Sequence, residues 1–340
     1  MSYLKENERY IIETMLQDGK KVKDISIRLN RHVSTIYNEI KRGTVILKDS
    51  NLKDYEKYCA DVGQRKQIEN SHNKGISLKI GNDYNTVNLI ESLVKDKRYS
   101  PYAVSVVLKQ NDSLTNLCTT TIYSYIHNGL FLNISNNDLS YKVSVKKQKE
   151  ETKRPCYKKL GAKSIEERDK VIYDRSDFGH WEMDTVYSGK NKGKECLLVL
   201  TERQTRSELI RKMKDRTAES VLNEINSIEK EIGYYQFRKV FKTITCDNGV
   251  EFSKYNEIES SCLSVAKRTL LYFCHPFASC ERGSNENANK LIRKFIPKGA
   301  DISEYDDTYI KNMESIINDM PRKMFNGLSS NQYRASLGIL

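Results

Sequence analysis

The segment that begins at His180 reads as a series of short strands, and this pattern constrains the fold more than any other feature. Residues 181–187 alternate between two faces, which is typical of a half-buried strand. Residues 196–200 form a continuous apolar run, and residues 208–213 give a third strand. Because the connections between these strands are short, we expect an antiparallel meander.

A helix and two more strands follow the meander. Thr217 can cap the helix and Gly233 can end it. The strands cover residues 240–246 and 269–274. Since a crossover helix returns the chain in its original direction, the first of them should lie parallel to the first strand of the meander. We therefore predict an α/β domain at residues 171–340, with a mixed five-stranded sheet and helices.

A final helix follows the last strand, between Ser284, which can cap it, and Pro297, which stops it. One face should belong to the core, because apolar residues recur there at helical spacing: Ala288, Leu291, Ile292, Phe295 and Ile296. The other face is polar and carries Glu286, Asn289, Lys290 and Arg293. A glutamate in a first turn often only complements the helix dipole, so Glu286 indicates a site only if it has partners.

Two aspartates can supply those partners. Asp184 lies in the first strand of the meander, and Asp247 ends a strand that can lie beside it. Close carboxylates repel one another unless a cation neutralises them, and an all-oxygen cluster suits Mg²⁺ or Mn²⁺. Two such ions can activate a water or a 3′-hydroxyl at a phosphodiester. Each acid alone could equally be a surface carboxylate, and Asp247-Asn248-Gly249 also reads as a turn.

Positive charge is concentrated in the N-terminal half. The net charge is +12; residues 1–163 carry 29 Lys and Arg against 18 Asp and Glu, whereas residues 164–340 carry 28 against 27. Such an excess favours binding to nucleic-acid phosphates, since their neutralisation releases counterions. A merely soluble basic surface would have the same composition, so the motifs must decide.

Residues 1–43 read as three short helices, at 6–18, 22–29 and 33–41. This pattern is typical of a helix-turn-helix DNA-binding domain, although a generic helical bundle has the same periodicity. The apolar residues expected to pack inward from the second and third helices are Val22, Ile25, Ile27, Leu29, Val33, Ile36, Tyr37 and Ile40. The side chains expected to contact bases or phosphates are Arg31, Ser34, Thr35, Asn38, Lys41 and Arg42.

Residues 44–134 indicate a further helical region. Its expected helices cover residues 84–95, 101–109 and 119–126, with one more near 55–62. The last helix repeats the Ser-Thr-Ile-Tyr character of residues 34–37, so we predict a second helix-turn-helix in which Thr120 and Thr121 contact DNA. Residues 135–170 form a basic linker, and its lysine run at 146–149 should make only non-specific phosphate contacts.

Three motifs occur in a fixed order in the C-terminal half. They read HWEMDT at residues 180–185, TCDNGVEF at 245–252 and ERGSNEN at 281–287. These motifs resemble those of the insertion sequence 30 family of DDE transposases. The resemblance spans nearly the whole chain, including the N-terminal helix-turn-helix.

The resemblance implies an RNase H-like catalytic core whose metal-binding triad is Asp184, Asp247 and Glu286. It implies cleavage and transfer of DNA strands that depend on Mg²⁺ or Mn²⁺. The implied partner is double-stranded DNA, as the terminal inverted repeats of an insertion sequence and as target. Because two ends must be processed together, we expect a homodimer or larger assembly. A DNA-binding regulator that keeps an inactive transposase-like body is the alternative.

The chain departs from the family pattern in three places. Between Asp247 and Glu286 lie 38 residues, a few more than is usual; Cys280 replaces an aromatic residue, and Lys290 replaces a common glycine. Lys290 and Arg293 are expected to contact DNA phosphate, but Lys290 could equally pair with Glu286 one turn before it. Three other acids near the motifs are expected to have supporting roles: Glu182, Glu251 and Glu281.

Cysteine usage and hydropathy exclude other classes. The eight cysteines form no CxxC pair, which favours reduced intracellular thiols over a disulfide framework or a zinc site. The N-terminus has no apolar signal region, and no run approaches 18 apolar residues. We therefore expect a cytoplasmic protein with no membrane span.

Overall fold

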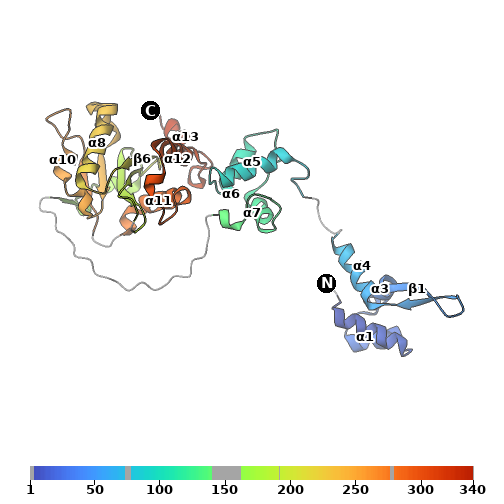
Figure 1. Cartoon of the computed structure of the whole chain (residues 1–340). Coiled ribbons are helices and arrows are strands. Elements are labelled where there is room, and N and C mark those ends of the chain that lie inside the picture. Colours follow the sequence, from blue (N-terminus) through green and yellow to red (C-terminus); the bar gives the residue numbers. More distant parts are fainter. Residues whose placement is uncertain (1–3, 73–77, 140–161, 191, 276–278, 340) are drawn as a thin grey trace. The chain divides into compact units, whose positions relative to one another are not determined.

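The computed structural model of the chain describes residues 4–72, 78–139, 162–190, 192–275 and 279–339 (Figure 1). It divides into two compact units, Met1–Gly81 and Asn82–Leu340. The lysine run of the expected basic linker, at residues 146–149, lies outside the described residues. No helix in the described part is both long and apolar enough to cross a membrane.

The N-terminal unit begins with the three helices that the sequence predicts. They are α1 Glu6–Gln17, α2 Val22–Leu29 and α3 Val33–Gly43. Asn30 ends α2 in the left-handed conformation, with φ of 49°, which asparagine tolerates better than most residues. Ile12, Ile25 and Ile36, one from each helix, are fully buried and form the centre of the core.

The apolar sides of α2 and α3 are narrower than predicted. Ile27 is 71% exposed and Tyr37 is 58% exposed, so the prediction that both pack inward is wrong. The reason is the helical period of about 3.6 residues. Ile27 lies two residues after the buried Ile25 and Tyr37 lies one after the buried Ile36, so both turn away from the core.

An antiparallel hairpin follows α3 directly. Its strands are β1 Thr44–Lys48 and β2 Asp54–Tyr58, and α4 Ala60–His72 comes next. The helix expected near residues 55–62 therefore begins only at Ala60. The preceding residues instead pair with β1, a contact that helical periodicity cannot reveal.

The second unit begins with three helices at the predicted positions. They are α5 Tyr84–Lys95, α6 Pro101–Lys109 and α7 Thr119–His127. Asp83 caps α5 and Ser100 caps α6 through their side-chain oxygens, which accept free N–H groups of the first turn. Each helix contributes a fully buried residue: Ile90, Val104 and Ile122.

A mixed sheet forms the centre of the rest of this unit. Its strands are β3 Lys163–Ser164, β4 His180–Tyr187, β5 Cys196–Glu202, β6 Glu208–Met213, β7 Thr243–Cys246 and β8 Leu270–Phe273. Their spatial order is β3-β8-β7-β4-β5-β6. As predicted, β4, β5 and β6 form an antiparallel meander, and β7 lies parallel to β4.

The prediction of five strands is wrong, because the sheet has six. The extra strand, β3, is only two residues long and pairs in parallel with Tyr272 and Phe273 of β8. Such a short strand has no periodicity of its own, so only its pairing identifies it. The strand expected at residues 240–246 starts at Thr243, because Val240 still belongs to helix α9 Tyr234–Val240.

Helices cover both faces of the sheet (Figure 1). Helices α8 Ala218–Ile232 and α9 pack on one face; α11 Gly283–Phe295 and α12 Asp307–Asp319 pack on the other. Strand β5 serves both cores, with Leu198 and Leu200 in the first and Leu197 and Val199 in the second. This double burial explains the continuous apolar run in its sequence. The shorter helices are α10 Tyr255–Glu259 and α13 Ser330–Ser336.

Candidate active site

Asp184 and Asp247 come together at two neighbouring parallel strands. In β4 and β7, Glu182 lies opposite Thr245, so Asp184 and Asp247, each two positions further along, come level. The Arg282 guanidinium lies between their carboxylates. Its Nη1 is 3.3 Å from Asp184 Oδ1, and its Nη2 is 3.0 Å from Asp247 Oδ2. The two predicted acids therefore share one cation.

Arg282 is a residue that the sequence reasoning missed. Burial opposes its charge, but the carboxylates of Asp184 and Asp247 outweigh that effect and raise the pKa of Arg282. Two close carboxylates repel one another, and a cation between them removes this cost. The only signal for Arg282 was its place inside the third motif, directly before α11.

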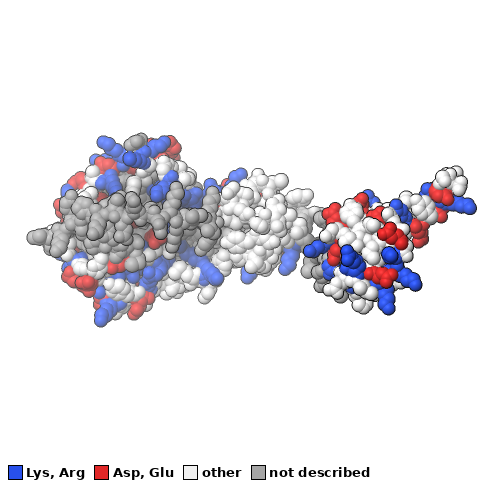
Figure 2. All heavy atoms as spheres, turned by 90° about the horizontal axis from the view of Figure 1, so that it is seen from below, with Lys and Arg blue, Asp and Glu red and all other residues white. Residues whose placement is uncertain are grey.

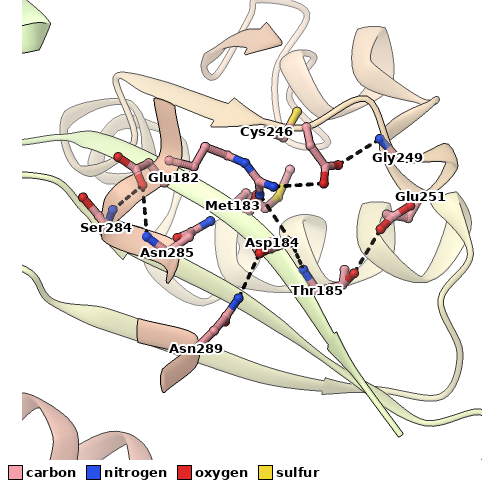
Figure 3. A network of polar contacts seen from close by, with 12 residues as sticks. Glu182, Met183, Asp184, Thr185, Cys246, Gly249, Glu251, Ser284, Asn285 and Asn289 are labelled. Carbon is pink, nitrogen blue, oxygen red and sulfur yellow. Dashed lines mark hydrogen bonds and ion pairs between the residues drawn. The ribbon is translucent and has the colours of Figure 1, made fainter. Parts of the chain in front are cut away.

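Further hydrogen bonds fix the two carboxylates (Figure 3). Asn289 on α11 donates from Nδ2 to Asp184 Oδ2 at 2.9 Å, and the Thr185 backbone N–H donates to Asp184 Oδ1 at 2.9 Å. Asp247 Oδ1 accepts the backbone N–H of Gly249 at 2.8 Å. The polar face of α11 thus reaches Asp184 through Asn289, one turn after Glu286.

Glu286 lies in the first turn of α11 and pairs with Lys290. The distance from Lys290 Nζ to Glu286 Oε1 is 2.8 Å, and both side chains are more than half exposed. A glutamate four residues before a lysine is the favourable orientation for such a pair. The structure therefore pairs Lys290 with the predicted third acid. In the described part of the chain, no three His, Cys, Asp or Glu side chains gather closely enough to hold a metal ion.

Glu182 attaches the first turn of α11 to β4. It is fully buried, and its Oε2 accepts the backbone N–H groups of Ser284 and Asn285, each at 3.0 Å. Its Oε1 accepts Arg203 Nη1 at 3.1 Å. A carboxylate at a helix N-terminus satisfies free N–H groups and complements the helix dipole. Glu182 therefore has the supporting role expected of it and positions the helix that carries Glu286.

The prediction that Ser284 caps α11 is wrong. The cap position is Arg282, and Ser284 lies inside the first turn. Its hydroxyl accepts a hydrogen bond from the Arg206 guanidinium instead. The capping acceptor comes from Glu182, about a hundred residues earlier in the chain, so local sequence could not identify it.

Glu251 also has a supporting position. One of its oxygens, Oε1, accepts Arg216 Nε at 2.8 Å and the Thr185 hydroxyl at 3.0 Å. The other, Oε2, would lie only 2.3 Å from a Cβ atom built on Gly249. The glycine of Asp247-Asn248-Gly249 is thus required for the close approach of Glu251 to this turn.

Glu281 contacts His275 and makes no hydrogen bond with the residues around Asp184 and Asp247 that the structure describes. It accepts the His275 backbone N–H at 2.8 Å and lies 2.7 Å from His275 Nδ1. The His275 Nε2 atom lies 3.1 Å from Glu166. The carboxylates of Glu281 and Glu166 raise the pKa of His275. This contact holds the segment before α11 against the region that leads into the sheet.

Comparisons with known proteins agree across the chain. A family model described as a helix-turn-helix domain matches residues 1–43. The probable transposase for insertion-like sequence element IS1161 of Streptococcus salivarius is 36% identical, over 95% of this chain and 91% of the relative. The chain belongs to the insertion-sequence transposases. Its relatives include the IS4351 transposase of Bacteroides fragilis, 30% identical over 97% of this chain and 94% of that protein.

A more distant match bears on the insertion sequence 30 family. The transposase InsI for insertion sequence element IS30C of Escherichia coli is 29% identical, over 47% of this chain and 38% of that protein. Together with the helix-turn-helix match, this supports the family predicted from the three motifs.

The helix-turn-helix of the transposase exposes part of its predicted DNA-contacting set. Ser34, Asn38 and Lys41 are exposed on α3. Tyr37 shares their face, since positions 34, 37, 38 and 41 follow helical spacing. The apolar pattern of the sequence predicts this tyrosine in the core, although its spacing from Ser34 and Lys41 indicates the outer face.

Two other residues of this unit that are predicted to contact DNA already have carboxylate partners within the unit. Arg31 Nε lies 3.1 Å from Glu8 Oε1, and Arg42 pairs with the buried Glu39. Thr35 is half-buried. These cations face carboxylates of their own unit, so a phosphate would have to compete for them. On the face of the N-terminal unit that Figure 2 shows, Lys and Arg are interspersed with Asp and Glu.

The remaining predicted contacts lie in the second unit. Thr120 and Thr121 open α7, and their hydroxyls lie 3.2 and 3.1 Å from the Cys118 sulfur. These hydrogen bonds lower the pKa of the Cys118 thiol to about 6. Arg293 donates to the backbone carbonyl of Tyr187 at 3.0 Å, which ties α11 to the end of β4.

Proposed function

We propose that this transposase cleaves and transfers DNA strands with an RNase H-like core, in which Asp184, Asp247 and Glu286 bind Mg²⁺ or Mn²⁺. The observation that carries the proposal is the convergence of Asp184 and Asp247, from two neighbouring parallel strands, on the guanidinium group of Arg282. The topology supports it, because a three-stranded meander, a crossover helix and parallel strands follow in the order expected of such a core. The family of the chain supports DNA as substrate.

The donor set fits a hard divalent cation. Asp184 and Asp247 present carboxylate oxygens toward one positive group, and carboxylates are the preferred ligands of Mg²⁺. Arg282 places cationic charge between Asp184 and Asp247, which lowers the cost of their close approach, and Lys290 forms a separate pair with Glu286. A bound divalent ion would supply activation of a water or 3′-hydroxyl and stabilisation of the leaving oxygen.

The chain's own residues orient this site. Asn289 holds Asp184, the Gly249 backbone holds Asp247, and Glu182 fixes the first turn of the helix that carries Glu286. Arg282 can in addition bind a phosphate oxygen, because a guanidinium recognises phosphate and carboxylate with the same geometry. We further propose that the N-terminal helix-turn-helix recognises terminal inverted repeats and that two or more copies act together on the ends.

A cleavage assay with the full chain tests the proposal. The substrate is a duplex that contains the inverted repeat flanking the gene, with Mg²⁺ present. The wild type should nick at the element end, and Asp184→Asn should reduce nicking at least about 1000-fold, equal to roughly 4 kcal/mol in barrier. Binding to the duplex should stay unchanged, because the DNA-reading unit is separate.

Glu219→Gln is the matched control, since it removes an exposed carboxylate on α8 that pairs with Lys254. It should nick like the wild type. Equal nicking by Asp184→Asn would refute the assignment of Asp184. A wild type that binds the repeat but never nicks it would support the non-catalytic regulator instead.

A further inference from the structure

A pocket rich in arginine lies beside the sheet. It encloses about 350 Å³ and is lined by Ile165, Arg168, Tyr173, Arg175, Arg203 and Glu281. We call Arg168, Arg175 and Arg203 the arginine pocket. Three guanidinium groups and one carboxylate therefore face the same space, which gives it a positive charge.

Arg168 forms the most unusual wall of the pocket. Its side chain is 3% exposed, and Nη1 donates to the Thr245 hydroxyl at 3.0 Å. The guanidinium carbon lies 4.3 Å from the centre of the Tyr173 ring. Its buried Nε has no hydrogen-bond partner, and within the described residues Arg168 forms no ion pair. A buried cation without a carboxylate partner is costly, so its presence calls for an anion.

Arg203 adds a second buried guanidinium. It is 4% exposed and shares Glu182 with two backbone N–H groups of α11. Its Nε is also buried, with no hydrogen-bond partner among the described residues. Burial lowers the pKa of Arg203 to about 10, and the charges of Arg168 and Arg175 act in the same direction.

The negative charge near the pocket is already engaged. Glu182 serves Arg203 and the helix, while Glu281 is hydrogen-bonded to His275. Arg175 stands exposed at the edge of the pocket and adds a third positive charge. An anion with several oxygen acceptors could accept hydrogen bonds from the guanidinium groups that line the pocket, and arginine recognises phosphate in this way.

The position of the pocket relates it to the candidate active site. Arg203 binds Glu182 and Arg168 binds Thr245, and these two residues are opposite each other on β4 and β7. Asp184 and Asp247 lie two residues further along, on the same face of the sheet, a distance of about 7 Å along a strand. The strand residues that hold Arg168 and Arg203 therefore lie two positions along the strands from the two aspartates.

We propose that the arginine pocket binds a phosphate group, and that this group is a backbone phosphate of the DNA strand that lies at Asp184 and Asp247. The second part rests on the proposed function. Repeating phosphates along one strand would allow the pocket to hold a neighbour of the phosphodiester that reacts. The contact would fix the register of the strand, which positions the reacting bond without taking part in the chemistry.

The first experiment tests the pocket without any reaction. Thermal unfolding of the full chain is followed by the fluorescence of Trp181, the single tryptophan, which lies in β4. Inorganic phosphate at constant ionic strength should raise the unfolding temperature of the wild type, because a ligand that binds the folded state stabilises it. Arg175→Asn and Arg168→Gln should abolish the phosphate-dependent rise.

The variants are chosen to keep the fold. Arg175 has a φ of 54°, which asparagine tolerates, and its side chain is exposed. Arg238→Gln removes an exposed arginine from α9 and should keep the full response to phosphate. An equal response of Arg175→Asn, Arg168→Gln and the wild type to phosphate would overturn the pocket as an anion site.

The second experiment assigns the phosphate to DNA. Single phosphates around the cleavage position are replaced in turn by neutral methylphosphonates, and cleavage is measured. One replacement within a few nucleotides of the reacting bond should lower kcat/KM about tenfold in the wild type, as expected for the loss of one charge-assisted hydrogen bond. Arg175→Asn should be less active on native DNA and insensitive to that same replacement.

The outcomes separate the two proposals. If the wild type does not cleave, the proposed function fails, and the phosphate-dependent unfolding still decides the pocket. If phosphate stabilises the wild type but every methylphosphonate affects Arg175→Asn as it affects the wild type, the pocket binds free phosphate and its assignment to the DNA strand is overturned.

Discussion

The N-terminal unit and the sheet region both contain many charged residues, but they place them differently. On α3 the polar side chains predicted to meet DNA include Ser34, Asn38 and Lys41, which lie on the surface. In the sheet region the charged side chains around the candidate active site are buried or surrounded by other side chains. Glu182 is fully buried, Arg203 is 4% exposed, and Arg282 lies between Asp184 and Asp247.

This difference teaches how each region should respond to change. Exposed charges are screened by salt and act almost independently, so their removal has small and graded effects. Buried charges hold one another in place, so the loss of one partner leaves the other uncompensated. The described residues of the N-terminal unit also include a buried ion pair, in which Arg9 Nε lies 2.7 Å from Glu39 Oε1.

The largest effect on stability is expected for Glu182→Gln. This change keeps the volume of the side chain but removes the charge that faces Arg203, and it weakens the attachment of α11. Breaking a buried ion pair in this way should lower the free energy of unfolding by about 4 kcal/mol. Denaturant unfolding followed by Trp181 fluorescence measures it.

The exposed pair of Glu219 and Lys254 supplies the control for that prediction. Glu219→Gln should change the free energy of unfolding by at most about 1 kcal/mol, as for other surface pairs. If Glu182→Gln costs no more than this control, the contrast between buried and exposed charge in the sheet region is wrong.

A smaller effect, confined to the other unit, is expected for Glu39→Gln. Arg9 would lose its carboxylate partner but keep hydrogen bonds to the Leu4 carbonyl at 2.7 Å and to Gln64 at 2.5 Å. The N-terminal unit should lose about 3 kcal/mol of stability, the lower end for a broken buried pair. Binding to inverted-repeat DNA should therefore fail at a lower temperature than in the wild type.

Trp181 fluorescence provides the matching control for Glu39→Gln. The two units are compact in themselves, so the unfolding midpoint that Trp181 reports should not move. A shift of that midpoint as large as the shift in DNA binding would contradict the independence of the two regions.

Several helices in both units were predictable because their signals are local. The three N-terminal helices and α8, with Thr217 and Gly233 at its ends, follow periodicity and capping residues within one or two positions. The meander and the parallel return of β7 also followed, because connection length and crossover handedness restrict topology. These features needed no knowledge of distant contacts.

The contacts at the candidate site were not predictable in the same way. Glu182 meets the α11 backbone, and Asn289 meets Asp184, across more than a hundred residues of sequence. The sequence allows Lys290 two partners, DNA phosphate or Glu286, and its contact with Glu286 at 2.8 Å is seen only in the structure. The third motif contains Arg282, but the position of Arg282 between two carboxylates depends on the pairing of β4 with β7.

The smallest effect is expected for surface charge on α3, and it sharpens the contrast within the N-terminal unit itself. Lys41 is exposed, whereas Arg42 pairs with Glu39. A cation that contacts a phosphate contributes about one unit to the slope of log affinity against log salt. Lys41→Ala should therefore lower that slope for repeat DNA by about 1, and Arg42→Ala should lower it less, because Arg42 already has a carboxylate partner.

Lys20→Ala is the control, because it removes an equal charge from an exposed lysine in the turn before α2. If Lys20→Ala lowers the slope as much as Lys41→Ala, the general positive field of the unit binds DNA and α3 has no special role.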